Sequence, residues 1–286
     1  MIPSISSTLP HLTQAFAPLT HASQAFNEFG ETLEVDMPAE RALTVYVDKR
    51  ELVTLMTLGA FPELLVLGFL RNQRLVTSAA DIASITVDWA VGAAAAKTRN
   101  GLVDIEQKTA KKTVTTGCGQ GSVYGDLMED VDKIRLPFVG QAHFSQATLY
   151  GVVNAIRLKE STYKSAGSVH ACALFKRDEL LCFVEDVGRH NALDTIAGWM
   201  WMNGVEPSLD LVFYTTGRLT SEMVIKSAQM GVPVVVSRSG ITQMGLAVAR
   251  QLGLCAIGRA TNKRFLLFSG AERFAPQPDL AGTKNS

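Results

Sequence analysis

The feature that most constrains the fold is a regular alternation of apolar runs and helical patterns in the second half of the chain. Three strand-like runs alternate with two helical patterns, in the order 209–214, 220–230, 232–236, 242–252 and 254–257. Gly231 and Gly253 follow the two helical patterns, as capping glycines do at helix C-termini. Strict alternation of this kind predicts a parallel sheet with crossover helices, and therefore an α/β fold.

Further elements extend this pattern in both directions. We expect strands at 43–47, 82–91 and 265–268, a hairpin of strands 169–175 and 180–185, and helices at 62–71, 145–159 and 191–202. The predicted fold is a mixed sheet with helices on both faces, joined to a smaller N-terminal α+β portion. The predicted division is a flexible tail at 1–38, the N-terminal portion at 39–140, the α/β domain at 141–274 and a second tail at 275–286.

Composition excludes several classes of protein. Hydrophobic residues make up 47% of the 286 residues, which is enough for a sizeable core and excludes wholesale disorder. Lys plus Arg and Asp plus Glu both number 27, so there is no chain-wide basic field for nucleic acid. The N-terminus lacks a signal-peptide pattern, and Pro62 and Glu63 interrupt the longest apolar stretch. We therefore expect a cytoplasmic protein that binds neither nucleic acid nor membrane.

Arginines stand at the predicted carboxyl ends of three successive strands. The segments are Thr216-Gly217-Arg218, Ser237-Arg238-Ser239 and Gly258-Arg259. Open α/β sheets bind ligands at this edge, glycine allows close approach to the backbone, and guanidinium groups match phosphate oxygens. The pattern favours a phosphate-bearing ligand over ordinary surface charges, although no Walker loop or GxGxxG fingerprint is present.

A second cluster of charge follows the predicted strand 180–185. Residues 185–194 read Glu-Asp-Val-Gly-Arg-His-Asn-Ala-Leu-Asp. Burying such groups is costly unless each finds a partner, so either a ligand or a polar network is expected there. The alternative is a solvated turn between a strand and a helix.

Cys118 differs from the other cysteines because it lies in a polar, glycine-rich segment, 115–122. Cys172, Cys182 and Cys255 lie in apolar runs, as small core residues do, and no CxxC pair is present. Three chemistries are open for Cys118: thiol–disulfide exchange, acyl transfer with a histidine base, and sulfur carriage as a persulfide. The last needs only one exposed, mobile thiolate and fits the segment most economically. The alternative is a tight turn in which the thiol of Cys118 has no functional role.

With these features in view, the chain resembles the FdhD family, the accessory sulfurtransferases for formate dehydrogenase, over roughly residues 43–274. The most specific match is 185–194. The other matching segments are Gly68-Phe69-Leu70, Val169-His170-Ala171-Cys172-Ala173-Leu174, Gly217-Arg218, Ser221-Glu222-Met223, Lys226-Ser227-Ala228 and Gly231-Val232-Pro233.

The resemblance implies a function. Family members take sulfur from a cysteine desulfurase as a cysteine persulfide and pass it to the molybdenum cofactor in its bis(molybdopterin guanine dinucleotide) form. Formate dehydrogenase then receives the sulfurated cofactor. The family's loop is typically Cys-Gly-x-Cys-Gly, and its persulfide-carrying cysteine falls on Cys118, whereas the second cysteine is replaced by Gly121.

The resemblance also implies a fold and a binding site. The family fold is similar to cytidine deaminases, but the deaminase zinc signature is missing, so we expect no metal ligated by protein. Arg218, Arg189 and His190 are further candidate contacts, and the family's cofactor-binding stretch falls on Arg259, Ala260, Thr261, Asn262, Lys263 and Arg264.

A cofactor with two similar halves suits a symmetric homodimer. Two rival interpretations remain: a cofactor-binding chaperone without sulfur chemistry, and a cysteine hydrolase that uses His190 or His170.

Overall fold

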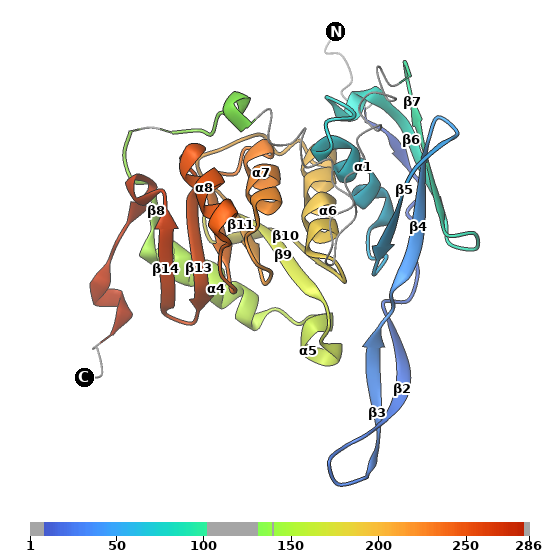
Figure 1. Cartoon of the computed structure of the whole chain (residues 1–286), viewed down its shortest axis with the longest axis horizontal. Coiled ribbons are helices and arrows are strands. Elements are labelled where there is room, and N and C mark those ends of the chain that lie inside the picture. Colours follow the sequence, from blue (N-terminus) through green and yellow to red (C-terminus); the bar gives the residue numbers. More distant parts are fainter. Residues whose placement is uncertain (1–8, 102–130, 139, 283–286) are drawn as a thin grey trace. The chain divides into compact units, whose positions relative to one another are not determined.

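The computed structural model describes residues 9–101, 131–138 and 140–282, which form two compact units (Figure 1). Of these residues, the first unit contains 9–101, 160–170 and 184–205. The second unit contains 131–138, 140–159, 171–183 and 206–282. Helix α6 and the turn before it belong to the first unit with the N-terminal elements, so the predicted α/β domain 141–274 is not one continuous unit. The predicted boundary at 274 stays a prediction.

A five-stranded mixed sheet forms the centre of the first unit. Its strands lie in the order β1-β6-β7-β4-β5, with bounds β1 His11–Leu12, β4 Arg41–Val47, β5 Arg50–Thr57, β6 Ile82–Asp88 and β7 Ala93–Thr98. Alternate residues of β4 point into the core, and Leu43, Val45 and Val47 are almost fully buried. The unit also contains the helices α1 (Pro62–Asn72), α5 (Thr162–Ala166), α6 (Arg189–Met202) and the 3₁₀ turn η2 (Ala79–Asp81).

Helices α1 and α6 pack in very close contact through two glycines. A Cβ atom on Gly68 of α1 would overlap the backbone carbonyl of Asp194 in α6, and one on Gly198 would overlap the carbonyl of Leu64. Asn72 Nδ2 donates to Asp194 Oδ1 over 2.7 Å across the same contact. Glycine at these two positions lets the two helix backbones approach this closely, because any larger residue would push them apart.

The expected N-terminal tail is wrong for residues 9–38. Strand β1 pairs in parallel with β6, and the Glu63 carboxylate of α1 accepts from Thr13 Oγ1 and from the Ala15 amide. Strands β2 (Thr20–Phe26) and β3 (Thr32–Pro38) then form an antiparallel hairpin. The sequence of this hairpin is rich in small and polar residues, because its strands pair only with each other and join no larger buried sheet. That composition led to the prediction of a flexible tail.

The second unit contains the predicted mixed α/β sheet, in the order β10-β9-β11-β12-β13-β14. Strands β11, β12 and β13 are parallel, whereas β9 and β14 run antiparallel beside them. The last three residues of β10, Val184 to Asp186, belong to the first unit. The bounds are β9 His170–Lys176, β10 Glu179–Asp186, β11 Leu211–Thr215, β12 Val234–Ser237, β13 Cys255–Thr261 and β14 Arg264–Ser269.

Helices cover both faces of this sheet, as predicted (Figure 1). Helix α4 (Gln146–Leu158) buries Leu149 and Val152 against one face, while α7 (Ser221–Gln229) and α8 (Gln243–Gln251) are the crossovers after β11 and β12. The short elements η3 (Val131–Lys133), β8 (Phe144–Ser145), η4 (Ala271–Arg273), β15 (Phe274–Ala275) and η5 (Pro278–Ala281) complete the unit. The last two show that the expected C-terminal tail is ordered at least to Ala281.

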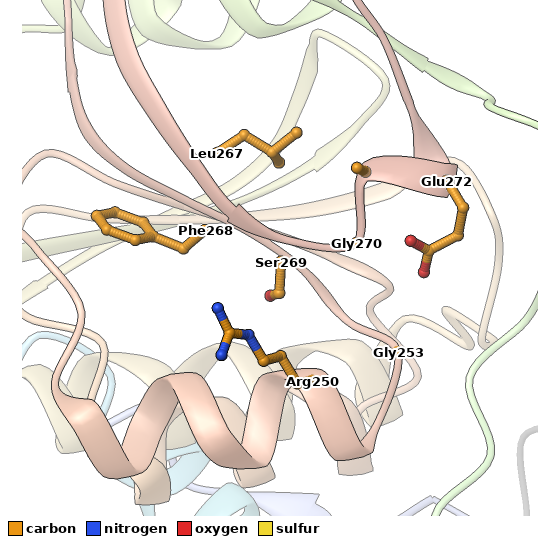
Figure 2. A pocket seen from close by; sticks show the side chains of 8 residues that line it. Arg250, Gly253, Leu267, Phe268, Ser269, Gly270 and Glu272 are labelled. Carbon is orange, nitrogen blue, oxygen red and sulfur yellow. The ribbon is translucent and has the colours of Figure 1, made fainter.

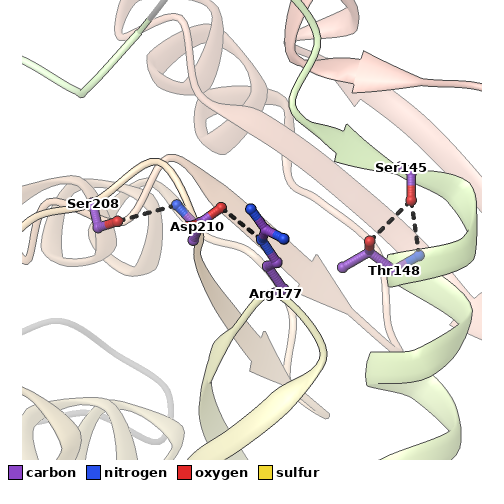
Figure 3. Close-up of polar contacts among 5 residues, drawn as sticks. All are labelled: Ser145, Thr148, Arg177, Ser208 and Asp210. Carbon is purple, nitrogen blue, oxygen red and sulfur yellow. Dashed lines mark hydrogen bonds and ion pairs between the residues drawn. The ribbon is translucent and has the colours of Figure 1, made fainter.

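Local hydrogen bonds fix the ends of these elements (Figure 3). Ser145 Oγ accepts from the Thr148 amide over 3.1 Å and so caps α4. The Arg177 guanidinium, in the β9–β10 turn, donates to Asp210 Oδ1 over 3.1 Å. Ser208 Oγ accepts from the Asp210 amide, so the segment before β11 is held beside that turn.

Most elements predicted in the second half are confirmed, whereas β5 and β7 of the first unit were missed in addition to β1, β2 and β3. Strand β5 follows β4 through Asp48 and Lys49, which both adopt positive φ, as a two-residue hairpin turn requires. Strand β7 is mostly alanine, which has little strand preference, so pairing with β4 and β6 decides its conformation. Among the described residues no helix is both long and apolar enough to span a membrane.

We predict that Gly68→Ala lowers the free energy of unfolding by about 3 kcal/mol or more, because α1 must move away from α6 to admit a methyl group. Chemical denaturation measures this change. Gly240→Ala is the matched control, since a Cβ atom there meets no atom within 4 Å, and it should change the free energy by less than about 0.5 kcal/mol. Equal effects in the two variants would contradict the close packing.

Candidate functional site

The carboxyl ends of β11 and β12 lie together at one edge of the second unit's sheet, because the two strands are parallel neighbours. The loops that follow are joined to each other beyond the strands. The Leu219 amide donates to the Gly240 carbonyl, and the Thr242 amide donates back to the Leu219 carbonyl. This pairing holds the first residues of α7 and α8 side by side. We call this region the strand-end edge.

Two fully buried hydroxyls hold the backbone of the strand-end edge. Thr215 Oγ1 accepts from the Gly217 amide over 3.0 Å, and Ser237 Oγ donates to the Gly217 carbonyl over 2.7 Å. Ser237 Oγ also accepts from the Ser239 amide. Sequence analysis missed Thr215 and named Ser237 only as part of a strand-end segment. A hydroxyl in the last position of each apolar strand was a signal that the strand end needs a polar partner.

The arginines of the strand-end edge are exposed, as the sequence predicted. Arg218 follows β11 and Arg238 follows β12, and both side chains reach solvent. The prediction for Arg259 needs a correction, because β13 does not end at Gly258 but continues to Thr261. Arg259 lies in an irregular part of β13 with φ +53°, and its amide donates to the Ser239 carbonyl. The bulge directs an exposed arginine beside the loop after β12.

The remaining predicted cofactor residues form the turn between β13 and β14. Thr261, Asn262, Lys263 and Arg264 are exposed, and Asn262 has φ +52°. Ala260 differs, because its side chain is buried in the hydrophobic core, so only its backbone is available to a ligand. Tyr150 Oη donates to the Lys263 carbonyl over 3.0 Å and ties this turn to α4.

A buried ion pair lies in the first two turns of α7, directly after the strand-end edge. Lys226 Nζ is 3.2 Å from Glu222 Oε1, and the two side chains are only 1% and 14% exposed. Removing either partner leaves a buried charge, which typically costs 3–5 kcal/mol. Sequence reasoning noted these residues only as matching segments, because helical spacing of Glu and Lys does not reveal burial.

The carboxylates of 185–194 serve the architecture of the first unit. Both Glu185 oxygens accept backbone amides, from Thr162 over 2.7 Å and Tyr163 over 2.9 Å, and so cap α5. The polar-network alternative is therefore confirmed for this residue.

Asp186 accepts four hydrogen bonds. Thr57 Oγ1 and the Leu58 amide donate to its Oδ2, and the Gly188 amide and Asn191 Nδ2 donate to its Oδ1 over 2.9 and 3.0 Å. Burial raises the pKa of Asp186, and the four donors oppose that rise. The carboxylate thus joins the end of β5 to the first turn of α6.

Arg189 and His190 occupy the first turn of α6, and each is 8% exposed. They belong to the first unit, whereas Arg218 and residues 259–264 belong to the second. The structure therefore brings Arg218, Arg238 and Arg259 together in the second unit. Contact of Arg189 and His190 with a cofactor stays a prediction.

Three of the four cysteines are poor nucleophiles. Burial raises the pKa values of Cys182 and Cys255 to about 12, and Cys172 is fully buried with its Sγ 3.3 Å from Thr215 Oγ1. At neutral pH the thiols of Cys182 and Cys255 stay protonated, and the thiolate is the reactive form. Cys118 lies outside the described residues.

A cavity of about 340 Å³ lies between the C-terminus of α8 and strand β14 (Figure 2). Arg250 reaches from α8 toward Ser269, and Gly270 and Glu272 line the far side. The lining residues come from the end of α8, the turn before β13 and the end of β14 with η4. The cavity therefore lies at the opposite edge of the sheet from Arg218 and Arg238. Within the described ranges no group of three or more His, Cys, Asp or Glu side chains could hold a metal ion.

Comparison with known proteins decides the family. The model of the FdhD/NarQ family matches residues 38–275. The chain belongs to this family. The match includes the strand-end edge, the 185–194 motif and Cys118, and it begins at the last residue of β3.

FdhD relatives and a solved structure agree with this assignment. The chain is 30% identical to the sulfur carrier protein FdhD of Bacillus subtilis over 248 residues, which is 86% of this chain and 94% of the relative. It is 28% identical to the protein of the same name from Listeria monocytogenes over 243 residues, or 85% and 93% of the two chains. A crystal structure from Desulfotalea psychrophila, described as a formate dehydrogenase accessory protein, covers 90% of this chain with its whole length. Its TM-score of 0.71 at 24% identity confirms the α/β fold.

Proposed function

We propose that this FdhD-family chain is a sulfurtransferase that carries sulfur as a persulfide on Cys118. In the first step the Cys118 thiolate attacks the outer sulfur of a cysteine desulfurase persulfide. The new S–S bond forms on Cys118 while the old one breaks, and the desulfurase cysteine leaves as a thiolate. The acceptor would be the molybdenum cofactor in its bis(molybdopterin guanine dinucleotide) form. The S–S bond on Cys118 would break after the persulfide proton has passed to solvent, and Cys118 would leave as a thiolate. The two electrons that convert the outer sulfur to a sulfide ligand would come from the acceptor's own metal, as Mo(IV) becomes Mo(VI).

The observation that carries this proposal is the match over residues 38–275 to a family whose relatives are named sulfur carrier proteins. The state of the other thiols supports Cys118 as the carrier. Cys182 and Cys255 have pKa values of about 12, so neither presents a thiolate at neutral pH, and Cys172 is fully buried and out of reach of a partner's persulfide. Gly121 stands where the family has its other cysteine. The transfer that we propose therefore uses Cys118 alone, without a second thiol nearby.

The strand-end edge supports an anionic acceptor. Exposed guanidinium groups of Arg218, Arg238 and Arg259 stand on a backbone that Thr215 and Ser237 hold rigid. Such groups bind phosphate oxygens through charge-assisted hydrogen bonds. We propose that this edge and the turn 261–264 bind the pyrophosphate and guanine portions of the cofactor. Arg189 and His190, in the first unit, stay separate candidates for contact with the cofactor.

The same proposal defines the partners. A cysteine desulfurase donates sulfur, and a formate dehydrogenase receives the sulfurated cofactor in the cytoplasm. A cofactor with two similar halves fits a two-fold homodimer, in which each subunit holds one guanine portion.

Mass spectrometry of the protein after incubation with a cysteine desulfurase and cysteine tests the sulfur step. We expect the peptide that contains Cys118 to gain one sulfur atom, which a reductant removes. Cys118→Ser should abolish the gain and the support of formate dehydrogenase activity. Cys182→Ser is the matched control and should retain both, because its thiol is buried and protonated. A Cys118→Ser protein that still supports the dehydrogenase would instead indicate a cofactor chaperone without sulfur chemistry.

Binding of GDP, which contains a guanine and a pyrophosphate, tests the strand-end edge. We expect Arg218→Gln and Arg259→Gln each to weaken binding about tenfold, since each removes about 1.4 kcal/mol of charge-assisted hydrogen bonding. Arg250→Gln changes an arginine at the opposite edge of the sheet and should leave the dissociation constant unchanged. Isothermal titration calorimetry measures all three. Weaker binding only in Arg250→Gln would move the site to the cavity of Figure 2.

A further inference from the structure

The zero net charge of the chain conceals a strong separation of charge along it. All 27 Lys and Arg residues lie after residue 40, whereas five of the 27 acidic residues lie at or before it: Glu28, Glu31, Glu34, Asp36 and Glu40. The first 40 residues therefore carry a net charge of −5, and the remainder carries +5. Separation of this kind indicates an interaction role for the acidic segment.

The acidic segment forms the β2–β3 hairpin, whose two faces differ. Leu33, Val35 and Met37 share one face, opposite Ala25, Ser23 and His21 on the partner strand. Glu34 and Asp36 lie on the other face. The hairpin is thus amphipathic, with an apolar face backed by carboxylates.

The apolar face and the tip of the hairpin are exposed. Leu33 and Met37 are 45% and 49% exposed, and Phe26 and Phe29 near the tip are 77% and 78% exposed. In the described part of the chain β2 and β3 pair only with each other, and β3 contacts α5 near its base (Figure 1). A two-stranded hairpin is marginally stable in water without a covering partner. Exposed apolar side chains gathered on one small element indicate an interaction surface.

We infer that the β2–β3 hairpin is an arm that docks on a second copy of this chain, with its apolar face against that copy. The net negative charge of the acidic segment attracts it to the positively charged remainder. This inference rests on the homodimer of the proposed function. Two hairpins packed on each other would bring together two segments of charge −5, so charge favours docking on residues after 40. Reciprocal docking of two arms satisfies two-fold symmetry and buries both hairpins.

Light scattering and sedimentation equilibrium of the full chain test the arm. The wild type should be a dimer whose dissociation constant rises with ionic strength, because the arm and its acceptor surface have opposite charge. The double variant Leu33→Ser/Met37→Ser should raise the dissociation constant about a hundredfold, since it removes two apolar contacts. Val91→Ser is the matched control: Val91 is 72% exposed in the same unit but belongs to the turn between β6 and β7, outside the hairpin, and its dimer should match the wild type.

Circular dichroism should show an unchanged fold in the double variant, because both side chains are exposed. A wild type that is monomeric at about 100 μM, or a double variant that dimerises as tightly as the wild type, overturns the inference. A double variant that keeps the dimer but loses affinity for a cysteine desulfurase also overturns it and assigns the arm to that enzyme. Persulfide formation on Cys118 is measured separately in the same samples, so a failure of the sulfur chemistry with an arm-dependent dimer rejects only the proposed function.

Discussion

The buried carboxylate of Asp186 is the interaction on which the first unit's charged motif depends. It collects four donors from two segments that are far apart in sequence, the end of β5 and the turn into α6. Removing a carboxylate from water is unfavourable, and only the full set of hydrogen bonds offsets that cost. Asn191 strengthens the same junction, because its Nδ2 also donates to the Met56 carbonyl over 2.7 Å. The first turn of α6 is therefore held in one place by polar contacts.

The acidic residues of 185–194 therefore have structural roles and are distinct from the residues proposed to bind cofactor and carry sulfur. Glu185 caps α5, Asp186 joins β5 to α6, and Asp194 accepts from Asn72 across the α1–α6 contact. The acidic groups that made 185–194 prominent in the sequence thus have structural partners. The exposed cations of the strand-end edge and the thiol of Cys118 remain as the groups suited to bind an anionic cofactor and to carry sulfur.

The sequence predicted the second unit better than the first for a physical reason. Strands β11, β12 and β13 are buried on both faces and alternate with helices, so composition alone marks them. The β2–β3 hairpin and β7 lack such a signal, because pairing and not hydrophobicity defines them. The arginines of the strand-end edge were predicted from strand order, but the bulge at Arg259 and the buried Ala260 were not, since register is set by contacts between strands. The similarity to cytidine deaminases stays a prediction.

The measurement that tests this account most directly is the free energy of unfolding of Asp186→Ala. If the carboxylate holds β5 to α6, its loss leaves four donors without their acceptor and lowers the free energy by about 3 kcal/mol or more. Glu51→Ala removes an exposed carboxylate from β5 and should change the free energy by less than about 0.5 kcal/mol. An Asp186→Ala protein as stable as the wild type would contradict the account and favour the other expectation for this motif, that its charged groups face a ligand.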